Sequence, residues 1–440
     1  MIFEDYSPSK EPTVDQQRDA LRKGLGRAVL WSRSGRLDPE LLLDACLRDL
    51  RYDRQIEEPR GHWLWEMIET RGVQELFRVP LLHALENLTD ERSAHQLCVL
   101  AQHYAATGDN AFRDRLYEIV EQRPHEQLEL LGEDELLALD GETAFRFIAR
   151  VRGRRLATRE WSWADTRFVE QGIEKFGRER VDQLFDEWTA KAVRRFRDCW
   201  RQNQQSESIA KPRQSYEQRL ASITVEEIFR TAETTLYGAN IRGWGKQASE
   251  VELNRVLERL WSEHDPKTLA NLLSAFQARA LPVFDSRLIE LCRHDDSRVR
   301  ERALSALEPN AHPEVRAFAL SELRRGLRDG RVVSLLNRNY QPGDEERILN
   351  AVELPIDVSD RHWLMLQVVE FLDMNPTANC SKLGVISYAL NPCGHCRYSA
   401  VRLLVDRRAA PEWMADECRS DSYPAIRSLI ASHDGRAAPR

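Results

Sequence analysis

Two thiols that could bind a metal stand near the C-terminal end of the sequence. Cys393 and Cys396 are separated by two residues, Gly and His. Such a pair can supply half of a tetrahedral zinc site, and Cys380 and Cys418 could complete a set of four thiolates. The same spacing also occurs in redox-active dithiols, because the N-terminus of a helix stabilises a thiolate.

The surrounding sequence favours a structural role for these thiols. No second Cys-x-x-Cys pair occurs, and a redox-active pair normally follows a β-strand, which no pattern predicts here. In the repeat described below, Cys396 takes the position of a small apolar residue that faces the core, and a free cysteine packs as one. We therefore expect no metal and no cofactor. Cys380, Cys393, Cys396 and Cys418 remain the residues to test for zinc.

A second group that could do chemistry is a basic segment within an acidic chain. Residues 146–213 hold 17 basic and 10 acidic residues, a surplus of 7, whereas the whole chain has a net charge of −7. A row of cations on one helix face can neutralise the phosphates of a nucleic acid. The alternative is an amphipathic helix whose basic, solvated face pairs with acids such as Asp182 and Asp186. The cations that could contact a polyanion or an acidic partner are Arg150, Arg152, Arg154, Arg155, Lys191, Arg194, Arg197 and Arg201.

The sequence contains no arrangement of residues typical of catalysis. Its 11 histidines include no His-Glu-x-x-His, and no Gly-x-Ser-x-Gly supports a hydrolase. Residues 243–247 lack the earlier glycine, the final Ser or Thr and the preceding strand of a phosphate-binding loop. His95 and His103 lie two turns apart on one expected helix, and we interpret them as a partly buried face. The sequence therefore favours a protein without catalytic activity.

The elements that would position these groups are helices. Helical periodicity extends along the chain, and no stretch alternates polar and apolar residues as a half-buried strand does. Asp265-Pro266 predicts a helix start, with the aspartate as cap and the proline in the first turn. Pro80 lies inside a helical pattern and predicts a kink or a break. Residues 181–201 are expected to form one long helix with an apolar, aromatic stripe.

The clearest pattern is a repeat in which an apolar residue precedes an arginine and two apolar residues follow one helical turn later. It begins at Val299-Arg300, Val315-Arg316, Cys396-Arg397 and, more faintly, Ile426-Arg427. The spacing places the apolar residues on one helix face, which must be buried against neighbouring helices. The pattern resembles HEAT repeats, most closely over 285–325 and 391–430. The resemblance implies an all-α fold, an α-solenoid of HEAT-like hairpins, in which the repeated arginine supports the interface between repeats.

Composition along the chain predicts three parts. Residues 1–201 are expected to form an N-terminal helical region of divergent repeats or a bundle. The polar residues 202–215 are expected to form a loop or linker, and 216–440 the HEAT-like repeat domain. The alternative is one continuous solenoid with a long insertion at 202–215.

Several features predict a cytoplasmic protein without membrane contact. No stretch approaches the roughly 18 apolar residues of a membrane span. The first residues lack the basic and apolar regions of a secretory signal. Eight cysteines in a chain of 440 residues indicate reduced thiols rather than a disulfide framework.

The leading hypothesis for function is a non-enzymatic scaffold or adaptor that binds a partner protein, because stacked helical hairpins present a long concave surface. The segments 63–65 and 161–163 each hold two tryptophans, and one ring of each pair could be an exposed hot spot. The alternative is that all these rings pack between helices. A second hypothesis is nucleic-acid binding through 146–213, since some HEAT-like proteins are DNA glycosylases with a basic concave face. A third, suggested by the same resemblance, is a bilin-lyase-type HEAT protein that handles a tetrapyrrole.

Overall fold

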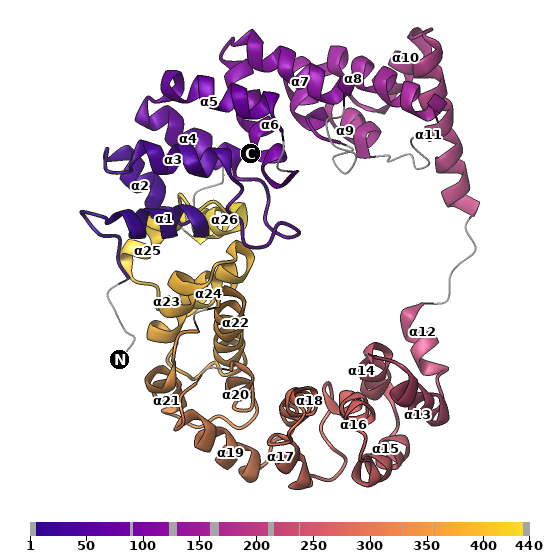
Figure 1. Cartoon of the computed structure of the whole chain (residues 1–440), viewed down its shortest axis with the longest axis vertical. Helices are drawn as coiled ribbons and strands as arrows, with labels where there is room; N and C mark the ends of the chain where they lie inside the picture. The colour runs from indigo at the N-terminus through magenta and orange to yellow at the C-terminus, as the bar shows by residue number, and fades with distance from the viewer. Residues whose placement is uncertain are drawn as a thin grey trace. The chain divides into compact units, whose positions relative to one another are not determined.

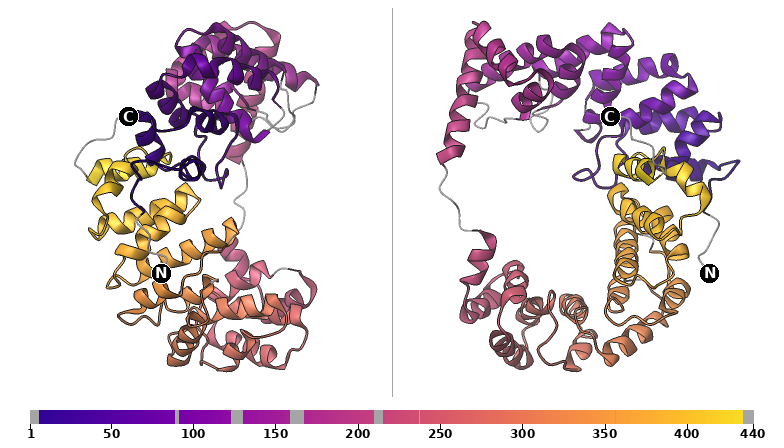
Figure 2. Two further views of the ribbon diagram at one scale, coloured as in Figure 1. Left: turned by 60° about the vertical axis from the view of Figure 1, so that its left-hand side comes forward. Right: turned by 180° about the vertical axis from the view of Figure 1, so that it is seen from behind.

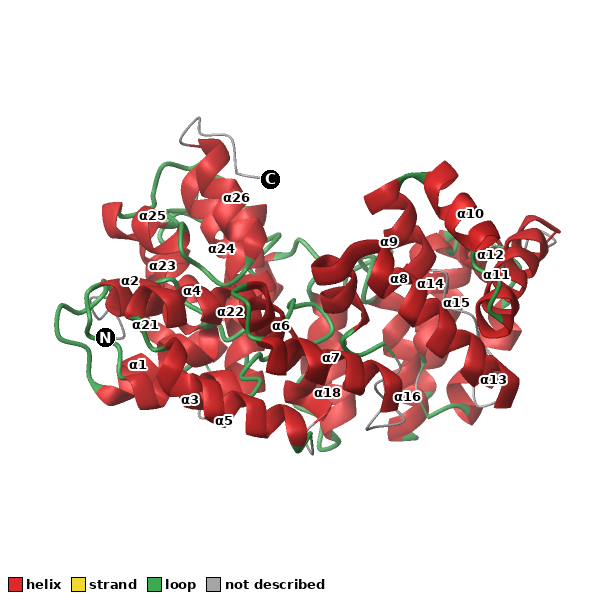
Figure 3. Cartoon of the chain, turned by 90° about the horizontal axis from the view of Figure 1, so that it is seen from above, coloured by secondary structure: helices red, strands yellow, loops and turns green. Residues whose placement is uncertain are grey.

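The structure is a computed structural model that describes residues 6–88, 91–122, 130–158, 167–209, 215–236, 238–327, 329–355 and 357–433. Within these ranges the chain consists of helices and loops, with no strand (Figure 3). The prediction of an all-α fold is confirmed for these residues. None of the helices in these ranges combines the length and the apolar character that a membrane crossing requires.

The chain divides into two units according to the packing of its backbone. The N-terminal unit comprises Pro8–Pro212 together with Asp416–Arg427. The C-terminal unit comprises Arg213–Ala415 together with the remaining ends of the chain. Each unit therefore contains residues that are far apart in the sequence.

The N-terminal unit is built from eleven helices among the residues described (Figure 1). They are α1 (Val14–Lys23), α2 (Arg27–Arg33), α3 (Pro39–Leu47), α4 (Gly61–Arg71), α5 (Gln74–Glu86), α6 (Glu91–Ala106), α7 (Asn110–Gln122), α8 (Glu133–Thr158), α9 (Arg167–Phe176), α10 (Arg178–Glu187) and α11 (Lys191–Ile209). Helix α6 packs against α4, α5 and α7, and α8 packs against α7 and α11. Helix α8 is bent at Gly141, whose φ of 54° favours glycine.

Three local predictions in this unit are corrected or refined. The single helix expected over 181–201 is wrong, because the chain leaves helical geometry after Glu187 and starts α11 at Lys191. The loop expected at 202–215 is helical as far as Ile209, and residues 210–214 lie outside the described ranges. Pro80 does not break its helix, since α5 continues from Gln74 to Glu86.

The C-terminal unit continues with shorter helices. They are α12 (Tyr216–Ala221), α13 (Val225–Thr234), α14 (Ala239–Gln247), α15 (Glu250–Ser262), α16 (Pro266–Leu273), the 3₁₀ helix η1 (Ser274–Phe276), α17 (Arg287–Leu291), α18 (Ser297–Leu307), α19 (Pro313–Leu323), α20 (Arg331–Ser334), α21 (Asp344–Ala351), α22 (Val358–Met374), α23 (Ser381–Leu390) and α24 (Gly394–Asp406). Helices α25 (Glu412–Cys418) and α26 (Pro424–His433) each cross the division between the units. Asp265 caps α16 by accepting a hydrogen bond from the Thr268 amide, as predicted.

An arginine recurs at the fourth position of several helices and bonds to the turn before its own helix. Arg300 of α18 donates to the carbonyl of His294 at 2.7 Å. Arg361 of α22 donates to the carbonyl of Pro355 at 3.0 Å, and Arg427 of α26 donates to the carbonyl six residues before it. A carbonyl group in a packed turn needs a hydrogen-bond donor. The arginine supplies this donor, so it holds the turn in place at the start of the helix. Arg361 belongs to this set although no apolar residue directly precedes it.

Arg316, in the same position of α19, bonds instead to the next turn along the chain. Its guanidinium donates to the carbonyl of Asn339 at 2.7 Å and pairs with the fully buried carboxylate of Asp344. This arginine therefore links α19 to the start of α21.

Residues 416–427 pack among the first helices of the N-terminal unit (Figures 1 and 2). The indole of Trp63 in α4 donates to the carbonyl of Ser420 at 2.9 Å. Arg27 of α2 pairs with the buried carboxylate of Glu417 at 2.9 Å. A Cβ at Gly26 would lie 1.8 Å from the Glu417 carbonyl oxygen, so only glycine permits this close approach.

Two adjacent carboxylates at the start of α8 have opposite environments. Asp134 is exposed and pairs with Arg167, whereas Glu135 is buried. Burial raises the pKa of Glu135 to about 7. The folded chain therefore holds this proton more tightly than the unfolded chain, whose carboxyl has a pKa of about 4.5.

Replacing Glu135 with glutamine is expected to stabilise the protein in a pH-dependent way. Because the pKa of Glu135 is raised in the folded chain, protonation of this carboxyl favours the folded state. Its contribution to the free energy of unfolding is fully present below about pH 4.5 and is lost as the pH rises to about 7. Glu135→Gln should change the free energy of unfolding little at pH 4 and raise it by about 3 kcal/mol at pH 8. Urea denaturation at both pH values measures the difference. Asp134→Asn is the control, and an equal gain from both variants at pH 8 would contradict the assignment.

Candidate binding groove and thiol–imidazole cluster

A groove of about 610 Å³ lies in the C-terminal unit, lined by residues of α14, α18, α20 and α22 and of the adjoining turns. Helix α22 contributes four residues whose helical spacing places them on one face, namely Asp360, Trp363, Gln367 and Glu370. The lining consists of Arg242, Gln277, Glu301, Arg302, Ser305, Glu308, Asp329, Gly330, Arg331, Ser334, Asp360, Trp363, Gln367 and Glu370. Five carboxylates and three arginines are among them, and we call this feature the acidic groove.

Some charges of the acidic groove are paired with one another, and others repel. Arg331 pairs with Asp329 at 2.9 Å and with Glu301 at 3.4 Å. Glu308 is half-buried, and its pKa is raised, first by burial and then by the negative charge of Glu370. A cation placed between Glu308 and Glu370 would therefore relieve an unfavourable interaction.

Trp363 stands in the acidic groove with 59% of its surface exposed. It follows His362 on α22, but the two side chains point to different places. Trp363 lines the acidic groove, whereas His362 contacts Cys396. Both tryptophans of segment 63–65 are buried, at 5% and 7%, so for this segment the alternative that the rings pack between helices is confirmed, and neither ring is an exposed hot spot. The other expected pair, at 161–163, lies outside the described residues. Sequence reasoning missed Trp363, and the only local signal was that it shares a helix face with the polar residues Asp360 and Gln367.

The predicted basic residues of α8 are mostly engaged with groups of their own unit. Arg152 is buried and forms an ion pair with the buried Glu133. Arg155 is buried and donates to the Val120 carbonyl. Arg154 pairs with Glu121 at the surface, and the guanidinium of Arg150 lies 5.4 Å from the ring of Phe147.

Two of the predicted basic residues of α11 form ion pairs, and the other two are exposed and line a hollow. Arg197 pairs with Asp186 and Asp198, and Arg201 lies within 3.8 Å of Asp182. These pairs match the alternative of a solvated basic face with acidic neighbours. Lys191 and Arg194 are exposed and line a shallow hollow on α11, with Arg195, Arg197, Asp198, Cys199 and Gln202.

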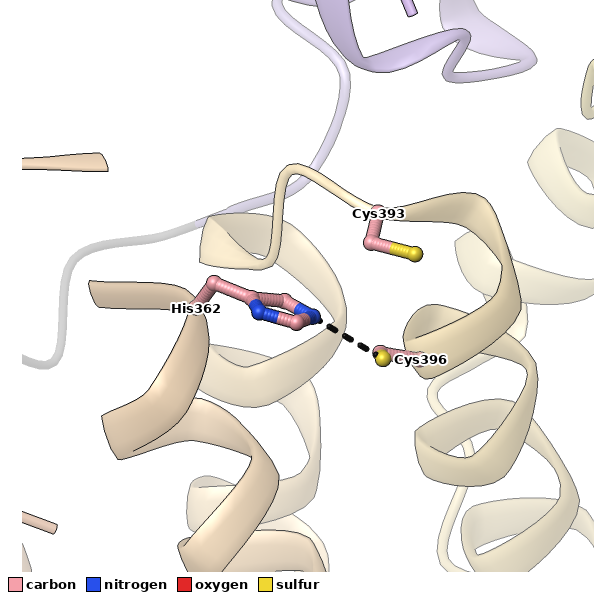
Figure 4. Close-up of side chains that lie close together, drawn as sticks. All are labelled: His362, Cys393 and Cys396. Carbon is pink, nitrogen blue, oxygen red and sulfur yellow. Dashed lines mark hydrogen bonds between the residues drawn. The ribbon is translucent and has the colours of Figure 1, made fainter. Parts of the chain in front are cut away.

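The structure brings Cys393 and Cys396 together with a histidine that the sequence analysis did not connect to them. Cys393 caps the N-terminus of α24 and is fully buried, and Cys396 lies in the first turn and is half-buried. His362 projects from α22 toward both (Figure 4). Its Nε2 lies 3.0 Å from the Sγ of Cys396, and one ligand atom from each of the three residues lies within 4.8 Å of the others. We call these residues the thiol–imidazole cluster.

Two details of this cluster differ from the sequence analysis, one for the repeat and one for the possible set of four thiolates. Cys396 is half-buried, whereas Val299 and Val315 are fully buried, and its thiol faces the imidazole of His362. The cluster also includes neither Cys380 nor Cys418, although both thiols are buried.

A second pair of histidines forms in the N-terminal unit. His103 of α6 does not pair with His95; its Nε2 lies 2.8 Å from Nδ1 of His62, and its ring stacks on Trp65. Burial and the neighbouring imidazole lower the pKa of His103 to about 4. The pair is therefore neutral near pH 7 and is part of the packing between α4 and α6.

No family model matches this sequence, and neither a curated protein nor a solved structure matches it.

Proposed function

We propose that the chain is a non-enzymatic scaffold or adaptor, and that its C-terminal unit is a HEAT-like α-solenoid that binds a partner protein in the acidic groove. The observation that carries this proposal is the exposed Trp363 beside carboxylates in a groove of about 610 Å³. Tryptophan is enriched among the hot-spot residues that carry most of the binding energy of protein interfaces.

The solenoid interpretation is supported by contacts between neighbours along the chain. Helices that pack closely in this unit are near in sequence, as in α22 with α23 and α23 with α24. The recurrent arginine at the fourth helical position marks repeating units, as the resemblance to HEAT repeats implies. Arg316 spans from α19 to the next turn, which is a contact between successive repeats under this interpretation.

The chemistry of the groove favours a partner segment that carries lysine or arginine. The five carboxylates exceed the three arginines of the lining, and one of these arginines is already paired with Asp329 and Glu301. One incoming cation could pair with Glu308 and Glu370, and a second could lie over the ring of Trp363, where the face of the indole attracts positive charge.

Trp363→Ala is expected to weaken binding of a basic ligand by about 30-fold, the loss typical of an interface hot spot. The probe is a fluorescein-labelled arginine-rich peptide, followed by fluorescence anisotropy, with a glutamate-rich peptide as the negative probe. The double variant Glu308→Gln/Glu370→Gln should also weaken binding and flatten its salt dependence.

Two control variants separate groove binding from general attraction to an acidic protein. Met374→Ala alters another exposed residue of α22 that does not line the groove, and Glu250→Gln removes an exposed carboxylate elsewhere. Both should bind like the wild type. Equal losses from controls and groove variants would overturn the proposal.

Affinity purification from the native host, with and without nuclease, distinguishes the scaffold from a nucleic-acid-binding protein. A protein that resists nuclease treatment and is lost with Trp363→Ala supports the scaffold. Recovery that requires intact nucleic acid and is lost with Lys191→Glu/Arg194→Glu supports polyanion binding on α11 instead.

A further inference from the structure

We propose that Cys393, Cys396 and His362 bind one Zn²⁺ ion. The three side chains come from two helices and converge, with one ligand atom of each within 4.8 Å of the others (Figure 4). In a tetrahedral site with zinc–sulfur bonds of about 2.3 Å, the ligand atoms are about 3.8 Å apart. Small rotations about the side-chain bonds bring the present atoms to that spacing.

The local fold supports two thiolates at these positions. Cys393 is the N-cap of the thirteen-residue helix α24, and Cys396 lies one turn into it. The unpaired amides of a helix N-terminus stabilise negative charge, so both thiols can lose their protons on metal binding. The amide of Cys393 donates to Oδ1 of Asn391 at 3.0 Å, which fixes the turn before the helix.

Burial favours a metal over a redox dithiol. A redox-active Cys-x-x-Cys attacks its substrate through the first thiol, which must be reached from solvent. Here Cys393 has no exposed surface, whereas Cys396 and His362 are half-buried. A buried thiolate needs a compensating charge, and a divalent cation between the three ligands supplies it.

The ligand set leaves the fourth position of zinc to an exogenous ligand. Structural sites normally have four protein ligands, and three protein ligands with a water molecule are the arrangement of open sites. His395, between the two cysteines, is exposed and does not belong to the cluster. The half-buried side of the site, at Cys396 and His362, is where water would enter.

Zinc analysis of the full chain tests the assignment. After incubation with zinc chloride and desalting, wild-type protein should retain about one zinc per chain, and Cys393→Ser, Cys396→Ser and His362→Ala should each retain far less. Cys380→Ala and Cys199→Ser are matched controls, and they should retain zinc like the wild type. Loss of zinc from Cys380→Ala alone would favour a different thiolate set and overturn the assignment.

Cobalt substitution of the wild-type chain tests the site without any variant. Addition of Co²⁺ should give thiolate-to-cobalt charge transfer in the near ultraviolet and visible bands of a four-coordinate ion. Azide should shift these visible bands, because it can replace the water at the open position. Absence of the charge-transfer band in reduced protein, or a Cys393–Cys396 disulfide that persists under mild reduction, would overturn the proposal. The outcome is independent of the acidic groove, since Trp363→Ala should retain zinc.

Discussion

Replacing Arg152 with methionine is expected to lower the free energy of unfolding of the N-terminal unit by about 3–5 kcal/mol. Arg152 and Glu133 are 1% and 3% exposed, and Nε of the arginine lies 3.1 and 3.2 Å from the two carboxylate oxygens. Burial already raises the pKa of Glu133, and the Arg152 charge opposes that shift. Without Arg152, the carboxyl remains buried and loses its ion pair, and only the weaker effect of Arg155 still favours its charged form. Urea denaturation followed by circular dichroism measures the loss.

Two further variants show whether the loss arises from the broken pair. Arg154→Ala alters the next arginine on the same helix, whose pair with Glu121 is about half-exposed, so it should cost about 1 kcal/mol or less. The double variant Arg152→Met/Glu133→Leu removes both buried charges and should recover most of the loss. Similar losses from Arg152→Met and Arg154→Ala would show that burial of the pair is unimportant. The guanidinium also lies 4.8 Å from the ring of Phe168, so recovery should be incomplete.

Gly153→Ala is expected to destabilise the same unit by about 3 kcal/mol, although alanine is the better helix former. Helices α8 and α11 cross here, and a Cβ at Gly153 would lie 1.8 Å from the carbonyl oxygen of Ala192. The obstacle is backbone, so no side-chain rotation can relieve it, and the helices must separate. Arg195 donates to the Gly153 carbonyl at 2.8 Å, and this bond should be lost as well. Thermal unfolding measures the change.

Gly238→Ala provides the comparison for the glycine substitution. A Cβ at Gly238 meets side-chain atoms at 3.2 Å, which can shift by small amounts. Gly238→Ala should change the free energy of unfolding by no more than about 1 kcal/mol. Alanine lowers the conformational entropy of the unfolded chain, and this gain offsets the mild crowding in the folded chain. If Gly153→Ala were equally harmless, the close crossing of α8 and α11 would be wrong.

Local signals in the sequence predicted much of the helical framework. The Asp265-Pro266 start has the expected geometry, because a cap depends on residues within one turn. The recurring arginines at 300, 316 and 427 were also visible, since each stands at a fixed distance from its helix start. What the pattern could not show was their partners, because the carbonyls and carboxylates they reach lie in turns of irregular length.

The features that sequence reasoning missed depend on packing between distant segments. Nothing near Cys393 and Cys396 indicates that His362 faces them from another helix. The sequence does not distinguish the buried Arg152 from the exposed arginines beside it. A pattern of charges does not show which cation pairs with a buried carboxylate. Trp363 was missed for the same reason, since exposure of one ring follows from how several helices leave a groove.

The return of residues 416–427 to the first helices has a consequence for biosynthesis. The carbonyl of Ser420 accepts from Trp63, and the buried carboxylate of Glu417 pairs with Arg27. A ribosome releases α1 to α11 long before these residues exist. Domains fold as units while the chain emerges, so residues 8–212 must wait for residues 416–427 to be translated before this unit is complete. During that interval the surfaces around Arg27 and Trp63 are open, and molecular chaperones would meet them there.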